Sequence, residues 1–287
     1  MSNRLNVLKT CKLYIGGKFS RSESEHFFQV LDKKQKPVAN LCRASRKDLR
    51  NAIQAARKVQ AGWAGRSAYN RGQILYRMAE MMEGRRDQFI AELERTASSK
   101  RRAENEVDLA IDRLVHYAGW TDKYSALFST VNPVASPHFN FSIPEPTGVV
   151  GIVAPDEQPL AALISLVAPV IAGGNVCVVL ASEKFGSVAC TLAEVIHSSD
   201  VPGGVVNVLT GFRADLVPHL AGHMDVNAVL CAADDPDQKK VIQEKAHLNV
   251  KRVHFYDGTD WMKDDAQSPY YIIDFQEFKT TWHPVGT

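Results

Sequence analysis

The chain has 287 residues, and its 34 Lys and Arg against 32 Asp and Glu leave a formal net charge of +2. Hydrophobic residues make up 45% and charged residues 23%, values that are typical of globular proteins and exclude a disordered or low-complexity chain. Because its few basic clusters are short and have acidic neighbours, we expect no nucleic-acid partner.

Cysteine spacing and hydropathy limit the class of protein further. The five cysteines are widely spaced with no Cys-x-x-Cys pair, which predicts neither a disulfide framework nor a zinc site. Residues 1–17 lack the long apolar core of a signal peptide. The uncharged stretch 159–181 is interrupted by Pro169 and by Gly173-Gly174-Asn175, which would break a membrane-spanning helix. We therefore expect a soluble, cytoplasmic protein without a membrane partner.

The first section, residues 1–128, has the pattern of a hairpin followed by helices. Apolar residues on both sides of Gly16-Gly17 predict a β-hairpin over 12–19. Ser45 and Asp48 have the spacing of a helix capping box. Apolar residues then recur at helical spacing in three segments. The residues are Leu49, Ile53, Ala56 and Trp63; Ile74, Met78, Met81 and Met82; and Val107, Ile111, Leu114 and Ala118.

The second section, residues 148–258, alternates apolar strands with helices. Strands that are apolar throughout and separated by single helices predict a parallel sheet covered on both faces, a doubly wound α/β domain. The five predicted strands are 148–153, 176–180, 204–209, 226–231 and 251–256, and the four helices are 160–172, 187–198, 213–221 and 236–247.

Two amphipathic segments do not fit that core. Residues 139–143 alternate between apolar and polar side chains, and the β-rich tail 268–282 has Ile273, Phe275 and Thr281 at positions of one parity. We expect segments 129–147 and 268–287 to form a small sheet outside the core. Exposed sheet edges of this kind usually meet a partner.

The motifs of nucleotide and metal chemistry are missing. The first predicted strand is followed by Ala-Pro-Asp-Glu-Gln-Pro (154–159), with no glycine that would let backbone N–H groups approach a phosphate. Asp234, Asp235 and Asp237 at the next helix start would cap the helix and repel a pyrophosphate. His219 and His223 lack a third metal ligand nearby, which favours surface or cap histidines. The residues therefore predict no catalytic, cofactor-binding or metal-binding site.

Several strings are nevertheless specific, and in unbroken order over about residues 12–256 they resemble the aldehyde dehydrogenase superfamily. They are LYIGG (13–17), VHYAGW (115–120), EPTGVVG (145–151), APVIAGGN (168–175), PGGVVNV (202–208) and HMDV (223–226). The resemblance implies a Rossmann-like coenzyme domain preceded by an N-terminal hairpin and helices.

The positions that carry the family's chemistry are altered. The resemblance places Glu157 where the family has an asparagine of the oxyanion hole, and a carboxylate there would oppose the developing negative charge. Ala181 stands at the place of the lysine that contacts the adenosine ribose, and Tyr256 at that of the general-base glutamate. The coenzyme turn is Cys-Ala-Ala-Asp (231–234), and none of the five cysteines aligns with the family's nucleophile.

The catalytic domain that follows in the family is also missing. Gly258 is joined by a short linker to FQEFKT (275–280), which resembles the family's C-terminal oligomerisation strand. The resemblance thus implies a truncated, catalytically degenerate member without the catalytic domain. It is similar to the second unit of two-unit, family 16-like aldehyde dehydrogenases.

These observations lead to one expected function and two alternatives. We expect a non-catalytic subunit, without a cofactor of its own, that binds and supports a full-length, active NAD(P)-dependent aldehyde dehydrogenase. One alternative is an NAD-binding regulatory module, for which Gly211 is the retained turn glycine; the other is an enzyme of altered chemistry using Glu157 or Tyr256. The predicted partner contacts are Ile273, Phe275 and Phe278 of the C-terminal strand, and Phe139, Phe141 and Ile143.

Overall fold

A seven-stranded sheet forms the centre of the computed structural model, which describes residues 7–96 and 99–286. Its order is β12-β11-β8-β9-β10-β2-β3, and the first five strands run parallel. The predicted doubly wound, five-stranded sheet is therefore confirmed. The bounds of its parallel strands are β8 (Val149–Val153), β9 (Val176–Leu180), β10 (Val206–Leu209), β11 (Ala228–Cys231) and β12 (Arg252–Phe255).

The predicted hairpin extends this sheet. Its strands are β2 (Leu13–Ile15) and β3 (Lys18–Ser20), and β2 pairs antiparallel with β10, with Tyr14 opposite Val208. Gly16 and Gly17 both have positive φ, as the tight turn between the strands requires. The Asn207 side-chain oxygen accepts a hydrogen bond from the Gly16 N–H at 2.9 Å and thereby fixes the turn against the core.

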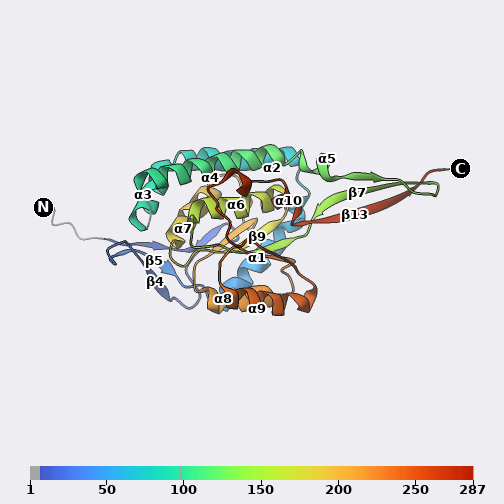
Figure 1. Cartoon of the computed structure of the whole chain (residues 1–287). Helices are drawn as coiled ribbons and strands as arrows, with labels where there is room; N and C mark the ends of the chain where they lie inside the picture. The colour runs from blue at the N-terminus through green and yellow to red at the C-terminus, as the bar shows by residue number, and fades with distance from the viewer. Residues whose placement is uncertain (1–6, 97–98, 287) are drawn as a thin grey trace.

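Helices cover both faces of the sheet (Figure 1). On one face lie α6 (Pro159–Ala172) and α7 (Gly186–His197), with α2 (Ala68–Glu83), α3 (Arg86–Thr96) and α4 (Lys100–Trp120) outside them. On the other face lie α1 (Arg46–Ala64), α8 (Arg213–Gly222) and α9 (Pro236–Ala246). Every residue of α6 is buried, because this helix lies between the sheet and the outer helices. Within the described residues, no helix is both long enough and apolar enough to span a bilayer.

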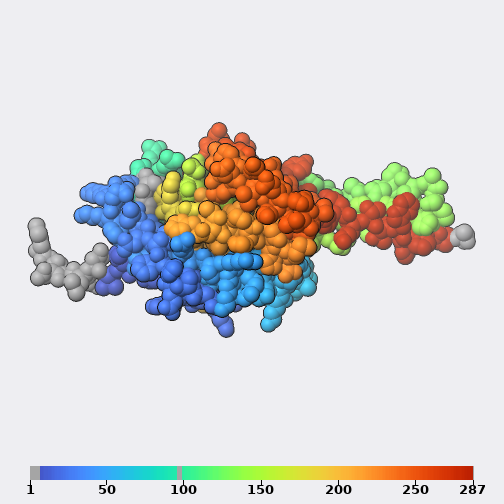
Figure 2. Space-filling view, turned by 90° about the horizontal axis from the view of Figure 1, so that it is seen from below, coloured from blue at the N-terminus to red at the C-terminus, as the bar shows by residue number. Residues whose placement is uncertain are grey.

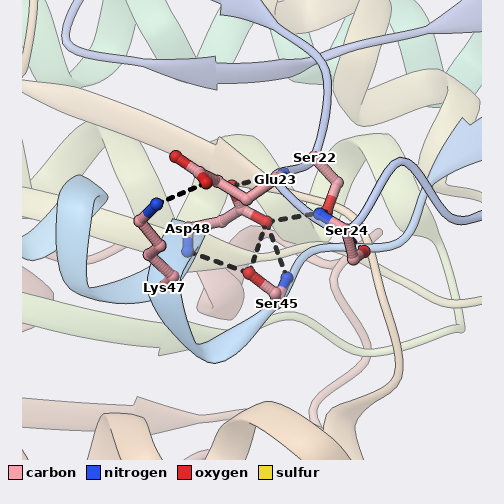
Figure 3. Close-up of polar contacts among 6 residues, drawn as sticks. All are labelled: Ser22, Glu23, Ser24, Ser45, Lys47 and Asp48. Atoms are coloured by element: carbon pink, nitrogen blue, oxygen red, sulfur yellow. Dashed lines mark hydrogen bonds and ion pairs between the residues drawn. The ribbon is translucent and has the colours of Figure 1, made fainter.

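The start of α1 is fixed by a cluster of short polar side chains (Figure 3). Ser45 and Asp48 form the predicted capping box, in which each side chain accepts a hydrogen bond from the other residue's backbone N–H. Asp48 also accepts a hydrogen bond from the Ser22 hydroxyl at 2.8 Å. Lys47 forms an ion pair with Glu23. The cap therefore ties the preceding loop to the first turn of α1.

A second, small sheet near the N-terminus was not predicted. Its order is β1-β5-β4, formed by β1 (Lys9–Cys11), β4 (Phe27–Leu31) and β5 (Pro37–Cys42). The expectation of only a hairpin and helices over residues 1–128 is therefore incomplete. Most side chains of β1 and β4 are exposed or partly exposed, so these strands lack the apolar pattern by which a buried strand is recognised.

The third sheet projects from the body as an arm (Figure 1). It has the order β13-β7-β6, with β6 (Thr130–Asn132) and β7 (His138–Pro146) following the short helix α5 (Tyr124–Phe128). β13 (Gln276–Pro284) pairs antiparallel with β7 along its whole length, from Gln276 opposite Pro146 to Pro284 opposite His138. The prediction that residues 139–143 pair with the tail outside the core is confirmed. We call these three strands the β-arm.

The tail is not a strand throughout, and this corrects the prediction. Residues Tyr270–Ile273 form a helical turn, α10, which packs against α6, so Ile273 is helical. Phe275 is completely buried in the core, and its carbonyl accepts a hydrogen bond from the Asn175 side-chain amide at 2.8 Å. The period-two pattern misled here because tertiary packing, not strand pairing, buries these apolar residues. Phe278 does lie in the strand, where it is partly exposed.

Candidate functional site

The carboxyl edge of the parallel sheet is the place where a doubly wound domain binds its ligand. The loops that meet at this edge are 154–158 after β8, 181–185 after β9, 210–212 after β10 and 232–235 after β11. We call this region the crevice. Its side chains come from four loops and from the helices that begin there, so their contacts decide what the crevice can bind.

An ion pair between Asp156 and Arg213 closes the crevice over β8. The guanidinium of Arg213 lies 2.9 Å from Asp156 Oδ1, and it also donates a hydrogen bond to the Ala154 carbonyl at 2.6 Å. The Ser182 hydroxyl, from the loop after β9, donates to the same Asp156 oxygen at 2.6 Å. These side chains therefore join three loops of the crevice to one another.

The two charges of this pair stabilise each other. Burial acts to raise the pKa of Asp156, but the Ser182 hydroxyl and the Arg213 guanidinium outweigh it and hold the pKa below its usual value. Only 8% of the Arg213 side chain is exposed, so water has little access to the guanidinium and would not replace Asp156 as its hydrogen-bond acceptor. The carboxylate and the guanidinium are therefore paired with each other.

Three helices that begin at the crevice have carboxylates of the chain itself at their N-termini. Glu106, from α4, accepts hydrogen bonds from the second and third residues of α6 at 2.9 and 3.3 Å. Glu183 accepts one from the first residue of α8 at 2.7 Å. Asp235, the N-cap of α9, accepts two at 3.0 and 3.1 Å. The predicted capping role of this aspartate is confirmed.

A helix N-terminus attracts anions because its first N–H groups have no partner within the helix. In α6, α8 and α9 some of these groups already donate to a carboxylate, which also neutralises the positive end of the helix dipole. Burial raises the pKa of Glu106 above its usual value even though two N–H groups favour its charged form. A pyrophosphate placed here would meet negative charge and occupied donors.

Glu157 lies at the mouth of a small cavity within the crevice, which Asp156 also lines. The side chain is exposed, and the cavity of about 280 Å³ is also lined by Arg102, Glu106 and Lys184. The next residue, Gln158, has a left-handed backbone with φ of 48° and donates to Asp260 Oδ1 at 2.6 Å. This contact ties the loop after β8 to the linker between β12 and β13.

Tyr256 lies apart from Glu157. Its hydroxyl donates to Asp274 Oδ2 at 2.6 Å, and its ring packs edge-on against Tyr271. Burial, together with the Asp274 carboxylate, raises the pKa of Tyr256 far above its usual value. The phenol therefore stays protonated and has an occupied hydrogen bond. Tyr256 does not line the cavity in which Glu157 lies, so the structure does not bring the two residues together in one site.

The five cysteines are all buried and reduced. Cys231 ends β11 at the edge of the crevice, where burial raises its pKa to about 11. A thiol with so high a pKa is a poor nucleophile at neutral pH, since the thiolate is the reactive form. Cys231 also lies 3.6 Å from the Ala233 carbonyl, a contact within its own turn.

His219 and His223, for which the sequence predicted surface or cap positions, lie at the C-terminal end of α8. His223 is the C-cap residue of this helix, and its Nδ1 accepts a hydrogen bond from the Asp225 N–H at 3.1 Å. Burial lowers the pKa of both His219 and His223. No group of three metal-ligating side chains occurs within residues 7–96 and 99–286.

Comparison with known proteins agrees with this fold. Residues 19–259 match the aldehyde dehydrogenase family. The chain belongs to the aldehyde dehydrogenase family. A mitochondrial benzaldehyde dehydrogenase from Antirrhinum majus is 31% identical over 269 residues, covering 92% of this chain and 48% of that protein. Omega-crystallin from Enteroctopus dofleini is 28% identical over 256 residues, covering 87% of this chain and 51% of that protein.

Solved aldehyde dehydrogenases share the arrangement of elements. The HpcC protein of Thermus thermophilus superposes with a TM-score of 0.83 at 25% identity, covering 87% of this chain and 48% of that one. An aldehyde dehydrogenase of Bacillus cereus, solved as its NAD+ complex, superposes with a TM-score of 0.82 at 23% identity, a likeness of fold alone. The chain spans about half the length of the aldehyde dehydrogenases that it matches.

Sequence reasoning missed three residues that shape this aldehyde dehydrogenase-like crevice, namely Arg213, Glu183 and Glu106. Each follows the end of a predicted strand or lies on a predicted helix, but none belongs to a motif. Arg213 could have been suspected because the carboxyl ends of parallel strands converge, which brings it near Asp156. Glu106 gave no such signal, because its contact with α6 depends on how α4 packs.

Proposed function

We propose that this chain is a non-catalytic aldehyde dehydrogenase-like subunit that binds and supports a full-length, active NAD(P)-dependent aldehyde dehydrogenase. The observation that carries the proposal is that the carboxylates of the crevice are paired within the chain. Its central carboxylate, Asp156, is paired with Arg213, and carboxylates occupy the N-termini of α6, α8 and α9. A crevice in this state favours a role that does not require a dinucleotide.

The β-arm supports the second half of the proposal, because it offers an open edge. β7 pairs with one side of β13, and within the described residues no strand pairs with the other side. Phe278 and Trp282 lie on one face of β13 and are 49% and 57% exposed. Free backbone groups beside exposed aromatic side chains suit the addition of a partner strand. By the family resemblance, the acceptor is the catalytic-domain sheet of the full-length enzyme.

The opposite face of the β-arm is also apolar. Phe139, Phe141 and Ile143 alternate along β7 on the face away from Phe278 and Trp282, and the rings of Phe139 and Phe141 lie 5.6 Å apart. Of the six predicted contact residues, these three and Phe278 keep this role in the proposal. Trp282 takes the place of Phe275, whose side chain the core has buried.

The connection from β12 to β13 makes the association one-sided. Residues 256–275 cross the body where the resemblance implies a catalytic domain, and Trp261 of this linker is buried. Arg113, from α4, donates to the Lys263 carbonyl at 2.8 Å and holds the linker down. A chain that donates the strand without an acceptor sheet cannot close a reciprocal homodimer, so it needs a different subunit as partner.

The two alternatives receive less support from the site. A Cβ at Gly211 would lie 3.2 Å from the Ala44 backbone nitrogen, so close packing accounts for this glycine without a phosphate. Tyr256 is protonated and bound to Asp274, and it does not line the cavity in which Glu157 lies, so the two residues form no activated pair.

Co-expression with a full-length aldehyde dehydrogenase of the same source, followed by gel filtration, tests the proposal. The wild-type chain should elute with the enzyme, whereas the double variant Phe278→Ser, Trp282→Ser should elute alone. Tyr76→Ser is the matched control, because it removes a ring that is 51% exposed on α2, away from the β-arm. A wild-type chain that elutes apart from every such enzyme, or a double variant that still co-elutes, would contradict the proposal.

Calorimetry with NAD tests separately whether the crevice binds a dinucleotide. We expect no measurable heat of binding at millimolar NAD with the isolated chain. Binding in the micromolar range would show that a phosphate can displace the carboxylates from the helix N-termini, and it would favour the NAD-binding module instead.

A further inference from the structure

Two cysteines that are far apart in the sequence meet at the junction of the small sheet and the core. Cys11 is the last residue of β1, and Cys190 lies in the middle of α7. Their side chains are only 3% and 5% exposed, and both residues line the same small cavity. Both belong to a small apolar cluster with Val30, Ala39 and Leu41 that is separate from the main core.

A cavity connects this thiol pair with the surface. Its volume is about 150 Å³, and both thiols line it together with Lys9, Phe19 and Glu194. Since a water molecule takes up roughly 30 Å³ in the liquid, a small oxidant such as hydrogen peroxide fits inside. Lys9 and Glu194 form a partly exposed ion pair at 2.9 Å beside the cavity, so the thiols lie just beneath a polar surface.

The surroundings of the two sulfur atoms differ. The neighbouring Cys190 thiol, together with the nearby Lys9 ammonium, lowers the pKa of Cys11 below its usual value. The neighbouring Cys11 thiol and burial raise the pKa of Cys190. Cys11 is therefore the nucleophile of the pair, and Cys190 is the neighbour that can resolve its oxidised form.

We propose that Cys11 and Cys190 are a redox modification site, at which hydrogen peroxide forms a reversible disulfide between β1 and α7. The Cys11 thiolate attacks one peroxide oxygen; an S–O bond forms, the O–O bond breaks, and the departing hydroxide takes a proton to become water. The Cys190 sulfur then gives up its proton and attacks the Cys11 sulfur. The S–S bond forms as the S–O bond breaks, and a second water leaves. Two thiols are oxidised by two electrons, and the peroxide is reduced.

The proposal is independent of the role as a subunit. The thiol pair lies at the N-terminal sheet and α7, whereas the crevice and the β-arm lie elsewhere on the chain. The disulfide would fasten β1, an edge strand of its sheet, to a helix of the central layer. Closing a long loop of chain restricts the unfolded state, so the oxidised protein should be the more stable one.

Peroxide treatment followed by alkylation and non-reducing peptide mapping tests the site. We expect the mass of one Cys11–Cys190 linked peptide, the loss of two of the five free thiols, and their full recovery with dithiothreitol. The oxidised protein should melt about 5 °C or more above the reduced protein. Cys11→Ser and Cys190→Ser should each abolish the link and the shift, whereas the control Cys231→Ser should retain both.

The mapping of the wild-type chain decides the outcome even if a serine variant folds poorly. A linked peptide that contains any other cysteine would overturn the proposal. Irreversible oxidation of Cys11 without a link to Cys190 would do the same, as would two thiols that stay free under peroxide.

Discussion

The crevice and the β-arm differ in whether their polar groups have partners within the chain. In the crevice, Asp156 receives hydrogen bonds from Ser182 and Arg213, and Glu183 covers the start of α8. In the β-arm, one edge of β13 faces outward, and Trp282 is largely exposed at its far end. A region whose charged groups are paired within the chain offers less to a charged ligand, whereas an open strand edge offers a row of unpaired backbone groups. This difference is the reason why we propose the β-arm as the partner-binding surface.

Figure 2 shows how sharply the two regions are divided: the body is a continuous mass of packed atoms, and the arm extends from one end of it. Phe275 and Phe278 lie on the two sides of this division, because the first is completely buried and the second is half exposed.

Phe275→Ala should lower the free energy of unfolding by about 4 kcal/mol, because it empties a buried aromatic site at the base of the arm. Phe278→Ala should cost about 0.5 kcal/mol, since its ring already contacts water. Urea unfolding of both variants measures the difference. Equal losses in the free energy of unfolding would mean that Phe278 is packed as tightly as Phe275, which would contradict the distinction between arm and body.

Asp156→Ala should cost about 3 kcal/mol, because it leaves the buried Arg213 guanidinium without its partner. The matched control is Asp215→Ala, which breaks the ion pair with Arg43. Both side chains of that pair are more than 40% exposed, so its loss should cost less than about 1 kcal/mol. If the two variants unfold at the same urea concentration, the crevice pair is not a buried one.

The pH dependence of stability should distinguish two crevice carboxylates. The pKa of Asp156 is lowered from 3.8, so its stabilisation is complete above pH 3.8 and is lost as the pH falls through the lower folded value. The pKa of Glu106 is raised from 4.5, so its ionisation destabilises the fold as the pH rises from 4.5 through the higher folded value.

Asp156→Asn and Glu106→Gln remove these contributions one at a time. Compared with the wild type, Asp156→Asn should therefore lose its disadvantage below pH 3.8. Glu106→Gln should gain on the wild type above pH 4.5, by about 1.4 kcal/mol for each unit of pKa shift. Thermal unfolding across the acid range measures both trends. Parallel curves for wild type and Glu106→Gln would show that the carboxylate is solvated.

Hydrophobic periodicity predicted the bounds of an element well where the element is buried on one face or along its whole length. The predicted strand 176–180 matches β9 residue for residue, and the helix predicted over 160–172 differs from α6 by one residue. The method failed at short segments. β1 and β4 are too exposed to show a pattern, and residues 270–275 mix apolar and polar side chains in a way that suits either a strand or the observed helical turn.

The site was less predictable, because its contacts join distant residues. Asp156 appeared only within the string 154–159, in which Glu157 was the residue singled out, and its partner Arg213 begins a helix to which sequence reasoning gave no function. The spacing of the five cysteines predicted no disulfide framework, although Cys11 and Cys190 line one cavity in the fold. No spacing along the chain could have revealed these pairs.

The sequence by itself determined the doubly wound core, since apolar runs of strand length between amphipathic helices are a local property that each segment carries alone. Only the tertiary structure decided which charges and thiols meet. Strand order brings the loops after β8, β9 and β10 together, and helix packing sets Glu106 against α6. A side chain buried by such packing must find its partner in whatever segment lies opposite, and that segment is chosen by the fold as a whole.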